Sequence, residues 1–589
     1  MMVCMRRDED RASKTGRLSM AVDVLAGRRP SLVFKLSYLA LAILSWNFLT
    51  ANTSLLTVVS VALTAFGFVL LTARVLRFSR FRRTCGLVLL VLFCISYVVS
   101  SAAVARYGVL SNVQGFVWLS LQCFALFAYD ASASPCDVRR DVEVFSGVFV
   151  AVTFVMALVG LVMAFVGYTY VGSIGYLGSS VGGMFGGRLF GLYSDVNLGA
   201  VCELVSALLS VAALCKGGLH RASVVFLVAN IVVEFAYVGL SASRTAVVAG
   251  VVSSFLLCLL LSARHKPKVA LDRDSKRDDS ADAPASPSHR RGAALRRGAW
   301  HVACGAMGSI LFLMLSFGSV FVYEKTSPWL FELLGGPVSS EDDLYEQALM
   351  QSDSIMPWDA REMIAEKNAA DAVSDEGAGG TEEPAAAQDP DAASGVGETD
   401  ASGQLDSPGE SDSSGLASGG GYGIGGRDVS GDVSTGRIDI WKAAVEVWKT
   451  SPLIGVSHRN FAAYVNDVMP GTYFTQPWTG YTTMHNVFVD TLVAQGLVGL
   501  VILLAFVVVL TRRLVTGYRL MDGQSKVFGA ALIACLLAIA VSALFYSEIL
   551  YINTIGAVVF WSFAGWCCAL GDGFRPRRGS CASCDTDPL

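Results

Sequence analysis

Charged residues are scarce in this chain. Of its 589 residues, 16% are Asp, Glu, Lys or Arg, whereas 53% are hydrophobic, and the mean hydropathy is +0.52. A soluble protein of this length could not bury so much apolar side chain, because the apolar residues lie in long runs. The composition therefore excludes a soluble globular protein and indicates a chain that resides in a lipid bilayer.

The apolar runs have the length of membrane spans. A helix needs about 20 apolar residues to cross the hydrocarbon core, and helices satisfy their own backbone polar groups there. The sequence predicts an all-α polytopic membrane protein of about 12 transmembrane helices, at 31–50, 52–73, 85–104, 108–129, 145–170, 196–215, 221–240, 245–263, 300–322, 485–510, 526–545 and 549–569. No cleavable signal peptide is expected, because the basic start leads into a full-length span.

Basic residues are concentrated in alternate loops. They occupy the N-terminal segment, "RVLRFSRFRR" (74–83), "DVRRD" (137–141), "KGGLHR" (216–221), 264–299, "TRRLVTGYR" (511–519) and "FRPRR" (574–578). With this number of spans they all fall on one side, which the positive-inside rule makes cytoplasmic. The predicted location is the cytoplasmic (inner) membrane, with the lipid bilayer as partner and with no nucleic-acid partner.

The predicted organisation follows from this topology. It comprises a cytoplasmic tail (1–30), transmembrane helices 1–8 (31–263), a cytoplasmic linker (264–299), transmembrane helix 9 (300–322), one large extracytoplasmic loop (323–484), transmembrane helices 10–12 (485–569) and a cytoplasmic tail (570–589). Both termini are expected in the cytoplasm.

Cysteine is absent from the predicted outer loop. All 14 cysteines lie in spans or cytoplasmic segments, which excludes disulfides from 323–484. Within this loop, 365–433 is rich in Ala, Gly, Ser and acidic residues. Ordering it would cost about 1–2 kcal/mol per residue with little apolar surface to offset that cost, so we expect disorder. The "CASC" sequence (581–584) is a weak metal or redox signal, and a solvated tail is the simpler interpretation.

A helix is predicted after the disordered stretch, within 434–455. Ile438, Trp441, Val445 and Trp448 fall on one apolar face of it. Two interpretations are open: the helix packs on other loop residues, or it lies on the membrane surface above a site. The second is favoured, because little other soluble mass surrounds it.

Isolated arginines on the predicted outer face disagree with the positive-inside bias. Arg244 lies in a short turn between two spans, and Arg188 lies in a glycine-rich loop (171–195) that has no P-loop motif. Such arginines either extend toward lipid phosphates or bind an anion through the planar guanidinium. Asn197, at the start of the next span, is either a helix-start residue or a ligand contact.

Of six histidines, His458 and His485 are predicted on the outer side. Their separation in sequence, without nearby cysteine, argues against zinc. His485 is either an anchor at the start of a span or a general base, since imidazole can accept a proton near neutral pH. Asn486 and Asp490 lie one helical turn apart, and Asp490 is expected to face the bundle interior because a carboxylate is costly in lipid. The same holds for Glu203 and Glu234 in predicted spans six and seven, although a proton-coupled transporter would also use such acids.

Four segments, taken in order, resemble the O-antigen ligase and polymerase superfamily, which are integral membrane glycosyltransferases of the GT-C type. They are "GRLFGLYSDVNLGA" (187–200), "GLSASRTA" (239–246), "GRIDIWKAAVEVWKTSPLIGVSHRNF" (436–461) and "HNVFVDTLVAQGLVGL" (485–500). The resemblance covers about 180–510 of the chain.

The resemblance implies a donor glycan on polyprenyl (undecaprenyl) pyrophosphate and a glycan or lipid-glycan acceptor. It implies that Arg244, Arg437 and Arg188 bind the pyrophosphate, and that His485 orients or deprotonates the acceptor hydroxyl. Asn197, Asn486 and His458 are the further substrate-binding candidates. The implied transfer inverts the anomeric centre and uses no metal or cofactor. The implied process is polysaccharide biosynthesis for the cell envelope.

Two departures and one rival class remain. Ser457 and His458 stand where the family has small glycines, and the acidic insert is unusual, so the acceptor side is expected to differ. The rival is a transporter or a lipid-linked oligosaccharide flippase, which would show repeat symmetry and broken helices near the midplane. Polar residues gathered on one face beside a large outer loop favour the glycosyltransferase. The sequence does not separate ligase from polymerase, and a protein O-glycosyltransferase is a further variant.

Overall fold

The protein was analysed as a computed structural model that describes residues 19–51, 53–173, 179–263, 287–334, 437–475 and 483–574. The predicted disordered insert (365–433) and the "CASC" sequence lie outside these residues.

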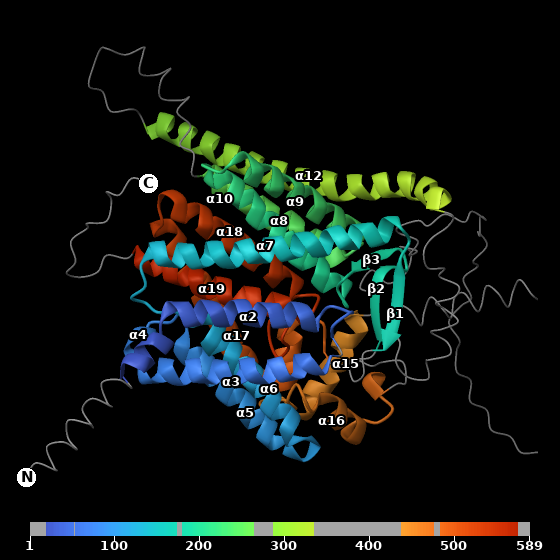
Figure 1. The fold of residues 1–589 in the computed structure, drawn as a ribbon. Coiled ribbons are helices and arrows are strands. Elements are labelled where there is room, and N and C mark those ends of the chain that lie inside the picture. Colours follow the sequence, from blue (N-terminus) through green and yellow to red (C-terminus); the bar gives the residue numbers. More distant parts are fainter. Residues whose placement is uncertain are drawn as a thin grey trace, which may run out of the picture.

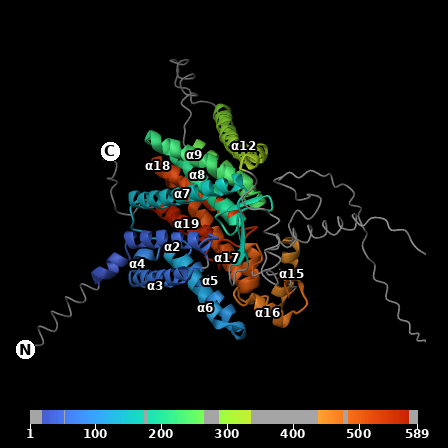
Figure 2. The same ribbon diagram turned by 45° about the vertical axis from the view of Figure 1, so that its right-hand side comes forward.

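Helices that lie side by side make up most of the fold (Figures 1 and 2). They are α2 (Arg28–Ser45), α3 (Ser54–Leu76), α4 (Phe78–Phe81), α5 (Leu87–Ala103), η1 (Ala105–Tyr107), α6 (Val109–Ser120), η2 (Leu121–Phe127), α7 (Pro135–Phe165), α8 (Val196–Lys216), α9 (Arg221–Leu240), α10 (Arg244–Ser262), α12 (Pro287–Leu334), α15 (Arg437–Thr450), α16 (Phe461–Val468), η5 (Tyr473–Thr475), α17 (Val487–Leu520), α18 (Gly523–Ser542) and α19 (Ile555–Gly573).

Ten of the described helices, with α6 and η2 taken as one, are long and apolar enough to cross a membrane. The predicted class, an all-α polytopic membrane protein, is therefore confirmed. The two other predicted spans also coincide with helices: α2 carries three basic residues, and α5 has only 17 residues. The span count of twelve stays a prediction.

Burial divides the helices into inner and outer ones. Of the most apolar 18-residue stretch of each helix, 89% is buried inside the protein in α19 and 78% in α8. In α3 and α12 only 17% of that stretch is buried. Figure 1 shows α12 along one edge of the bundle. The exposed apolar surfaces of α3 and α12 are those expected to face lipid.

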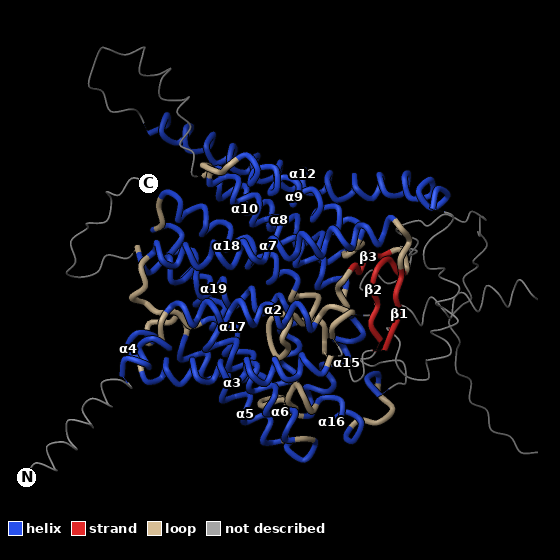
Figure 3. The backbone as a smooth tube through the Cα atoms, viewed as in Figure 1, coloured by secondary structure: helices blue, strands red, loops and turns tan. Residues whose placement is uncertain are grey.

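A three-stranded antiparallel sheet caps one end of the bundle. Its strands are β1 (Thr169–Ser173), β2 (Ser179–Phe185) and β3 (Arg188–Gly191), in the order β1-β2-β3. Figure 3 shows these strands close to α15 and α16. We call this part of the molecule, formed by β1–β3, α15 and α16, the sheet end.

Glycines of the predicted loop 171–195 take part in this sheet. Gly186 and Gly187 form the two-residue turn between β2 and β3, with φ of 57° and 66°. Positive φ at both positions is the requirement of a hairpin turn that matches strand twist, and glycine adopts it without strain. The turn places Arg188 opposite Phe185 as the first residue of β3.

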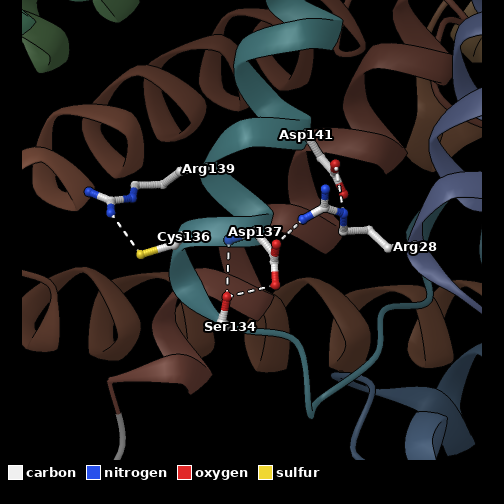
Figure 4. A network of polar contacts seen from close by, with 6 residues as sticks. All are labelled: Arg28, Ser134, Cys136, Asp137, Arg139 and Asp141. Carbon is white, nitrogen blue, oxygen red and sulfur yellow. Dashed lines mark hydrogen bonds and ion pairs between the residues drawn. The ribbon is translucent and has the colours of Figure 1, made fainter. Parts of the chain in front are cut away.

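The start of α7 differs from its predicted position, 145–170. The helix begins at Pro135, with Ser134 Oγ accepting from Asp137 N at 3.1 Å and donating to its carboxylate at 2.8 Å. Arg28 pairs with Asp137 and, at 3.2 Å, with Asp141 (Figure 4). Thus "DVRRD" forms the first turns of a helix and is not a loop, because proline and a serine cap start a helix at this point.

Helix α12 also extends beyond its predicted span of 300–322, on both sides. Conversely, the last predicted span (549–569) begins later than expected, at Ile555, where Thr554 caps α19 by accepting from Ala557 N at 2.9 Å. Residues 543–554, between α18 and α19, form a largely buried connection.

Helix α17 is interrupted at Gly496, whose φ is 64° and ψ −165°. The segment 452–457 pairs with the backbone groups that the interruption releases: Leu497 N donates to Pro452 O at 2.9 Å, and Ser457 N donates to Ala494 O at 2.9 Å. A broken helix was the expectation for a transporter. Here the released groups are satisfied by this loop, so they are not left to coordinate an ion.

Helix α15 does not bury the predicted face. Its buried residues are Ile440, Ala444 and Val447, whereas Ile438 and Val445 are 48% and 37% exposed. The buried side joins a cluster with Val456, Phe461, Val465, Phe474, Met484 and Val493, and Trp441 and Trp448 pack against it. The helix therefore packs on other residues of the sheet end, which was the less favoured interpretation.

Candidate active site

The predicted arginines and His485 lie at the starts of elements that meet at the sheet end. Arg188 begins β3, Arg244 begins α10, Arg437 begins α15, and His485 lies two residues before α17. Arg188 and Arg244 each follow a turn, where a polar side chain avoids the apolar bundle.

Arg188 is fixed against the turn between α9 and α10. Its Nε donates to Ser241 O at 3.2 Å, and its terminal nitrogen donates to Asn197 Oδ1 at 3.3 Å. Asn197 Oδ1 also accepts from Ser243 Oγ at 2.8 Å. This oxygen therefore joins β3 to the start of α10, so Asn197 positions the arginines whether or not it contacts substrate.

Arg244 is exposed at the start of α10. Ser243 caps this helix by accepting from Ala246 N at 3.3 Å, and Ala242 before it has a φ of 48°. The buried serine and the left-handed alanine hold the turn in a defined shape. Arg244 thus begins its helix directly after the turn that Arg188 contacts through Ser241 O.

Asp195 links Arg188 to the connection between α18 and α19. Its carboxylate caps α8 by accepting from Asn197 N and Leu198 N, each at 2.8 Å. Burial raises the pKa of this carboxyl, while these N–H groups, the charge of Arg188 and a hydrogen bond with Tyr546 act in the opposite direction.

His485 lies beside Tyr546, with ring centroids 6.3 Å apart. Burial, together with the charge of Arg437, lowers the pKa of His485 to about 4. The imidazole is therefore neutral at neutral pH, which is the form able to accept a proton. Its backbone φ is 50°, a left-handed conformation that costs energy in a non-glycine residue and is found disproportionately at functional sites.

Two hydrogen bonds of Met484, the residue directly before His485, support this conformation. Met484 N donates to Asp490 Oδ1 at 2.7 Å, and Met484 O accepts from Trp441 Nε1 at 3.0 Å. The second oxygen of Asp490 accepts from Ser547 Oγ. Asp490 was expected to face the bundle interior, and its side chain is 3% exposed. From there it supports the segment around His485 through its hydrogen bond with Met484 N.

Asn486 caps α17. Its Oδ1 accepts from Phe488 N at 2.9 Å and Val489 N at 3.2 Å, and its Nδ2 donates to Leu544 O at 3.0 Å. Both polar atoms of the side chain thus have protein partners, which explains the residue by helix capping. Its predicted contact with substrate stays a prediction.

Arg437 lies close to the same connection. Its Nε donates to Phe545 O at 3.1 Å, one residue before Tyr546. Arg188, Asp195, Tyr546, His485 and Arg437 therefore form one continuous set of neighbours. Sequence reasoning missed Tyr546; the available signal was the polar "YSE" (546–548) between predicted spans eleven and twelve.

His458 lies between α15 and α16 and packs against another part of the connection 543–554. Its ring stacks on Tyr551, with centroids 4.8 Å apart and planes at 17°. Burial lowers the pKa of His458 to about 3, and neither ring nitrogen has a hydrogen-bond partner among the described residues. Ser457 donates to Asn112 Oδ1 at 2.7 Å. Ser457 and His458, which depart from the family pattern, thus belong to a second polar cluster near α5 and α6.

No group of three or more His, Cys, Asp and Glu suited to a metal ion occurs in the part of the chain that the structure describes.

The fold and the site define a polytopic helical membrane protein that gathers arginines and a neutral histidine at one end of its bundle. Residues 228–504 match the family model described as O-antigen ligase, and this match supports the O-antigen ligase superfamily. Arg244, Arg437, His458, His485 and Asn486 lie within the match, whereas Arg188 and Asn197 precede it. No curated protein matches the chain. The family is one of membrane enzymes that process glycans.

Proposed function

We propose that this protein transfers or polymerises a glycan from a polyprenyl-pyrophosphate donor, at the outer face of the cytoplasmic membrane, onto a glycan or lipid-glycan acceptor. The observation that carries the proposal is the neutral His485 beside Arg437 and Tyr546, at the bundle end that also holds Arg188 and Arg244. A base next to concentrated positive charge is what attack on a pyrophosphate-linked sugar requires.

In the proposed reaction the acceptor hydroxyl oxygen attacks the anomeric carbon of the donor. The bond from that carbon to the pyrophosphate oxygen breaks, and its electron pair leaves on polyprenyl pyrophosphate. The hydroxyl proton passes to the imidazole of His485. One displacement inverts the anomeric centre.

The arginines supply the positive charge that the leaving group needs. A guanidinium forms planar two-point hydrogen bonds with phosphate oxygens, each contributing about 1.5–3 kcal/mol. Arg244 and Arg437 would bind the pyrophosphate, with Arg188 behind them. These bonds strengthen as negative charge accumulates during bond cleavage, which lowers the barrier. The chain thus carries the positive charge for a transfer that uses no metal.

The proposal is tested in cells that lack this protein, complemented with the wild type, His485→Ala or Arg244→Lys. Arg106→Lys is the matched control, because Arg106 pairs with Asp467 at 3.1 Å and both side chains are well exposed. We expect Arg106→Lys to restore surface polysaccharide and His485→Ala to fail. Accumulation of single lipid-linked repeat units would define a polymerase, and accumulation of long lipid-linked chains a ligase.

A transporter or flippase would give a different result. Lipid-linked intermediates would stall on the inner leaflet, and His485→Ala would restore the polysaccharide. Either outcome would contradict the proposed transfer.

A further inference from the structure

A cluster of buried polar side chains lies inside the bundle, where α7, α8 and α9 meet. Glu203, Ser206 and Ser210 recur along one face of α8, and Asn230 and Glu234 lie one turn apart on α9. These five side chains are 0% exposed. The proposed glycan transfer uses none of them.

One oxygen of each carboxyl group accepts a hydrogen bond from a hydroxyl group. Tyr193 OH donates to Glu203 Oε1 at 2.6 Å, and Ser206 Oγ donates to Glu234 Oε1 at 2.8 Å. The other oxygen of each, Oε2, is buried and receives no hydrogen bond from protein N–H or O–H groups in the described part of the chain. Yet the two carboxyl groups lie within hydrogen-bonding reach of each other. Two ionised carboxylates cannot make such a contact, because both oxygens are acceptors.

The neighbouring donors are already engaged. Thr153 Oγ1 donates to Ser206 Oγ at 2.7 Å, and Asn230 Nδ2 donates to Ser206 at 3.2 Å and Ser210 at 2.9 Å. Asn230 Oδ1 has no partner among the described residues, so it adds a further acceptor and no donor. The cluster therefore has more lone pairs than protons.

Charge leads to the same conclusion. Tyr193, Tyr237 and Cys202 are the other titratable groups that interact with the pair, Asp195 and Glu548 interact with these in turn, and none of them carries a positive charge. No described lysine, arginine or histidine forms an ion pair with either glutamate. Two uncompensated carboxylates inside a membrane bundle would cost several kcal/mol each.

We infer that Glu203 and Glu234 form a proton-binding site, in which one proton is held between their Oε2 atoms. With that proton present, all four carboxyl oxygens take part in a hydrogen bond and one negative charge is removed. Glu203 accepts a hydrogen bond from Tyr193, which lies two residues before Asp195, so the proton site lies beside the turn that leads to the cap of α8.

The first test is infrared difference spectroscopy of the purified full-length protein in H2O and D2O, comparing the wild type with Glu203→Gln and Glu234→Gln. Because one proton is shared, each single variant should lose one protonated-carboxyl absorption, of the kind that shifts in D2O. Glu446→Gln is the control, since Glu446 is exposed and pairs with Lys449; its difference spectrum should contain a carboxylate absorption only. If both buried variants lose only carboxylate absorption, the pair is ionised and the inference is wrong.

The second test follows melting temperature as the pH is raised, in sodium chloride and in choline chloride. The folded wild type should lose stability when the shared proton leaves, because both carboxylates then repel each other. Glu234→Gln should be less sensitive, since its amide N–H donates to Glu203 in place of the proton. Stabilisation by sodium but not choline would identify a metal cation instead of a proton and overturn the inference.

The wild type alone also provides a test if a variant fails to fold. Its protonated-carboxyl absorption must decrease in alkali while carboxylate absorption rises, before the protein unfolds. No such change up to the unfolding point would contradict the site. None of these readouts needs glycan transfer, so they can fail or succeed independently of the proposed function.

Discussion

Trp441 and Met484 are joined by a hydrogen bond, in which the indole Nε1 donates to the carbonyl oxygen at 3.0 Å. Met484 directly precedes His485, so a tryptophan of α15 helps to set the position of the imidazole. We expect Trp441→Phe to keep the apolar packing, lose this bond, and lower the transfer rate about tenfold, because a net hydrogen bond contributes about 0.5–1.5 kcal/mol.

Trp448→Phe is the matched control for that variant. It removes a similar indole bond, from Nε1 to Pro452 O at 2.9 Å, elsewhere on the same helix. Melting temperature and initial rate are measured for both proteins. Equal losses of rate in both would mean that α15 acts only through general stability.

The pH dependence of transfer should reflect the lowered pKa of His485. If the neutral imidazole is the base, activity falls when the pH drops through about 4, and not near the value of about 6.5 typical of free histidine. Arg437→Gln removes a positive charge that lowers this pKa. In this variant the acid limb of the pH–rate profile should therefore shift to higher pH. Lys442→Gln is the control, because Lys442 is exposed and pairs with Asp439. An unshifted limb in Arg437→Gln would argue against the imidazole as the titrating group.

His458→Phe should separate stability from function. Burial lowers the pKa of His458 to about 3, so the unfolded chain binds a proton below about pH 6.5 that the folded chain excludes. Stability is therefore lost as the pH falls from 6.5 toward 3, and phenylalanine removes this loss while keeping the stack on Tyr551.

We expect His458→Phe to melt at a higher temperature than the wild type at acid pH, with a smaller difference at neutral pH. If His458 contacts the acceptor, the same variant should transfer poorly. A variant that is both stable and fully active would assign His458 to packing alone.

The interruption of α17 depends on glycine at position 496. A Cβ there would lie 2.3 Å from the backbone of Leu453, and the φ of 64° is unfavourable for any other residue. Gly496→Ala should destabilise the protein by at least about 2 kcal/mol. Gly147→Ala is the control, because a Cβ at that helical position meets nothing within 4 Å; it should stabilise α7 by about 0.5–1 kcal/mol. Thermal unfolding in detergent measures both, and equal effects would contradict this role of Gly496.

The class of protein could be predicted from the sequence because lipid imposes simple rules. Apolar runs of about 20 residues are almost bound to form helices, and each predicted span coincides with one. The ends of helices were harder to predict. Because Ser134 caps the helix and Pro135 begins it, α7 starts ten residues before the predicted 145. Such capping depends on single local hydrogen bonds, which hydropathy does not detect.

The candidate site was predicted in its residue types but not in its connections. Arg188, Arg244 and His485 could be singled out, since isolated polar residues beside spans are unusual, whereas Arg437 was indicated only by the family resemblance. Tyr546 and Ser547 could not, because their roles come from contacts with residues far away in the chain, Asp195 and Asp490.

The sequence by itself determined that this is a polytopic helical membrane protein, because hydrophobic length alone decides whether a segment enters the bilayer. It also determined the order of the segments that resemble the O-antigen ligase superfamily. Only the tertiary structure decided which side α15 buries, that loop 452–457 completes the broken helix α17, and that Glu203 meets Glu234. These depend on how helices rotate and pack against one another, and in a bundle apolar on nearly every face that rotation is set by a few buried polar contacts, not by hydropathy.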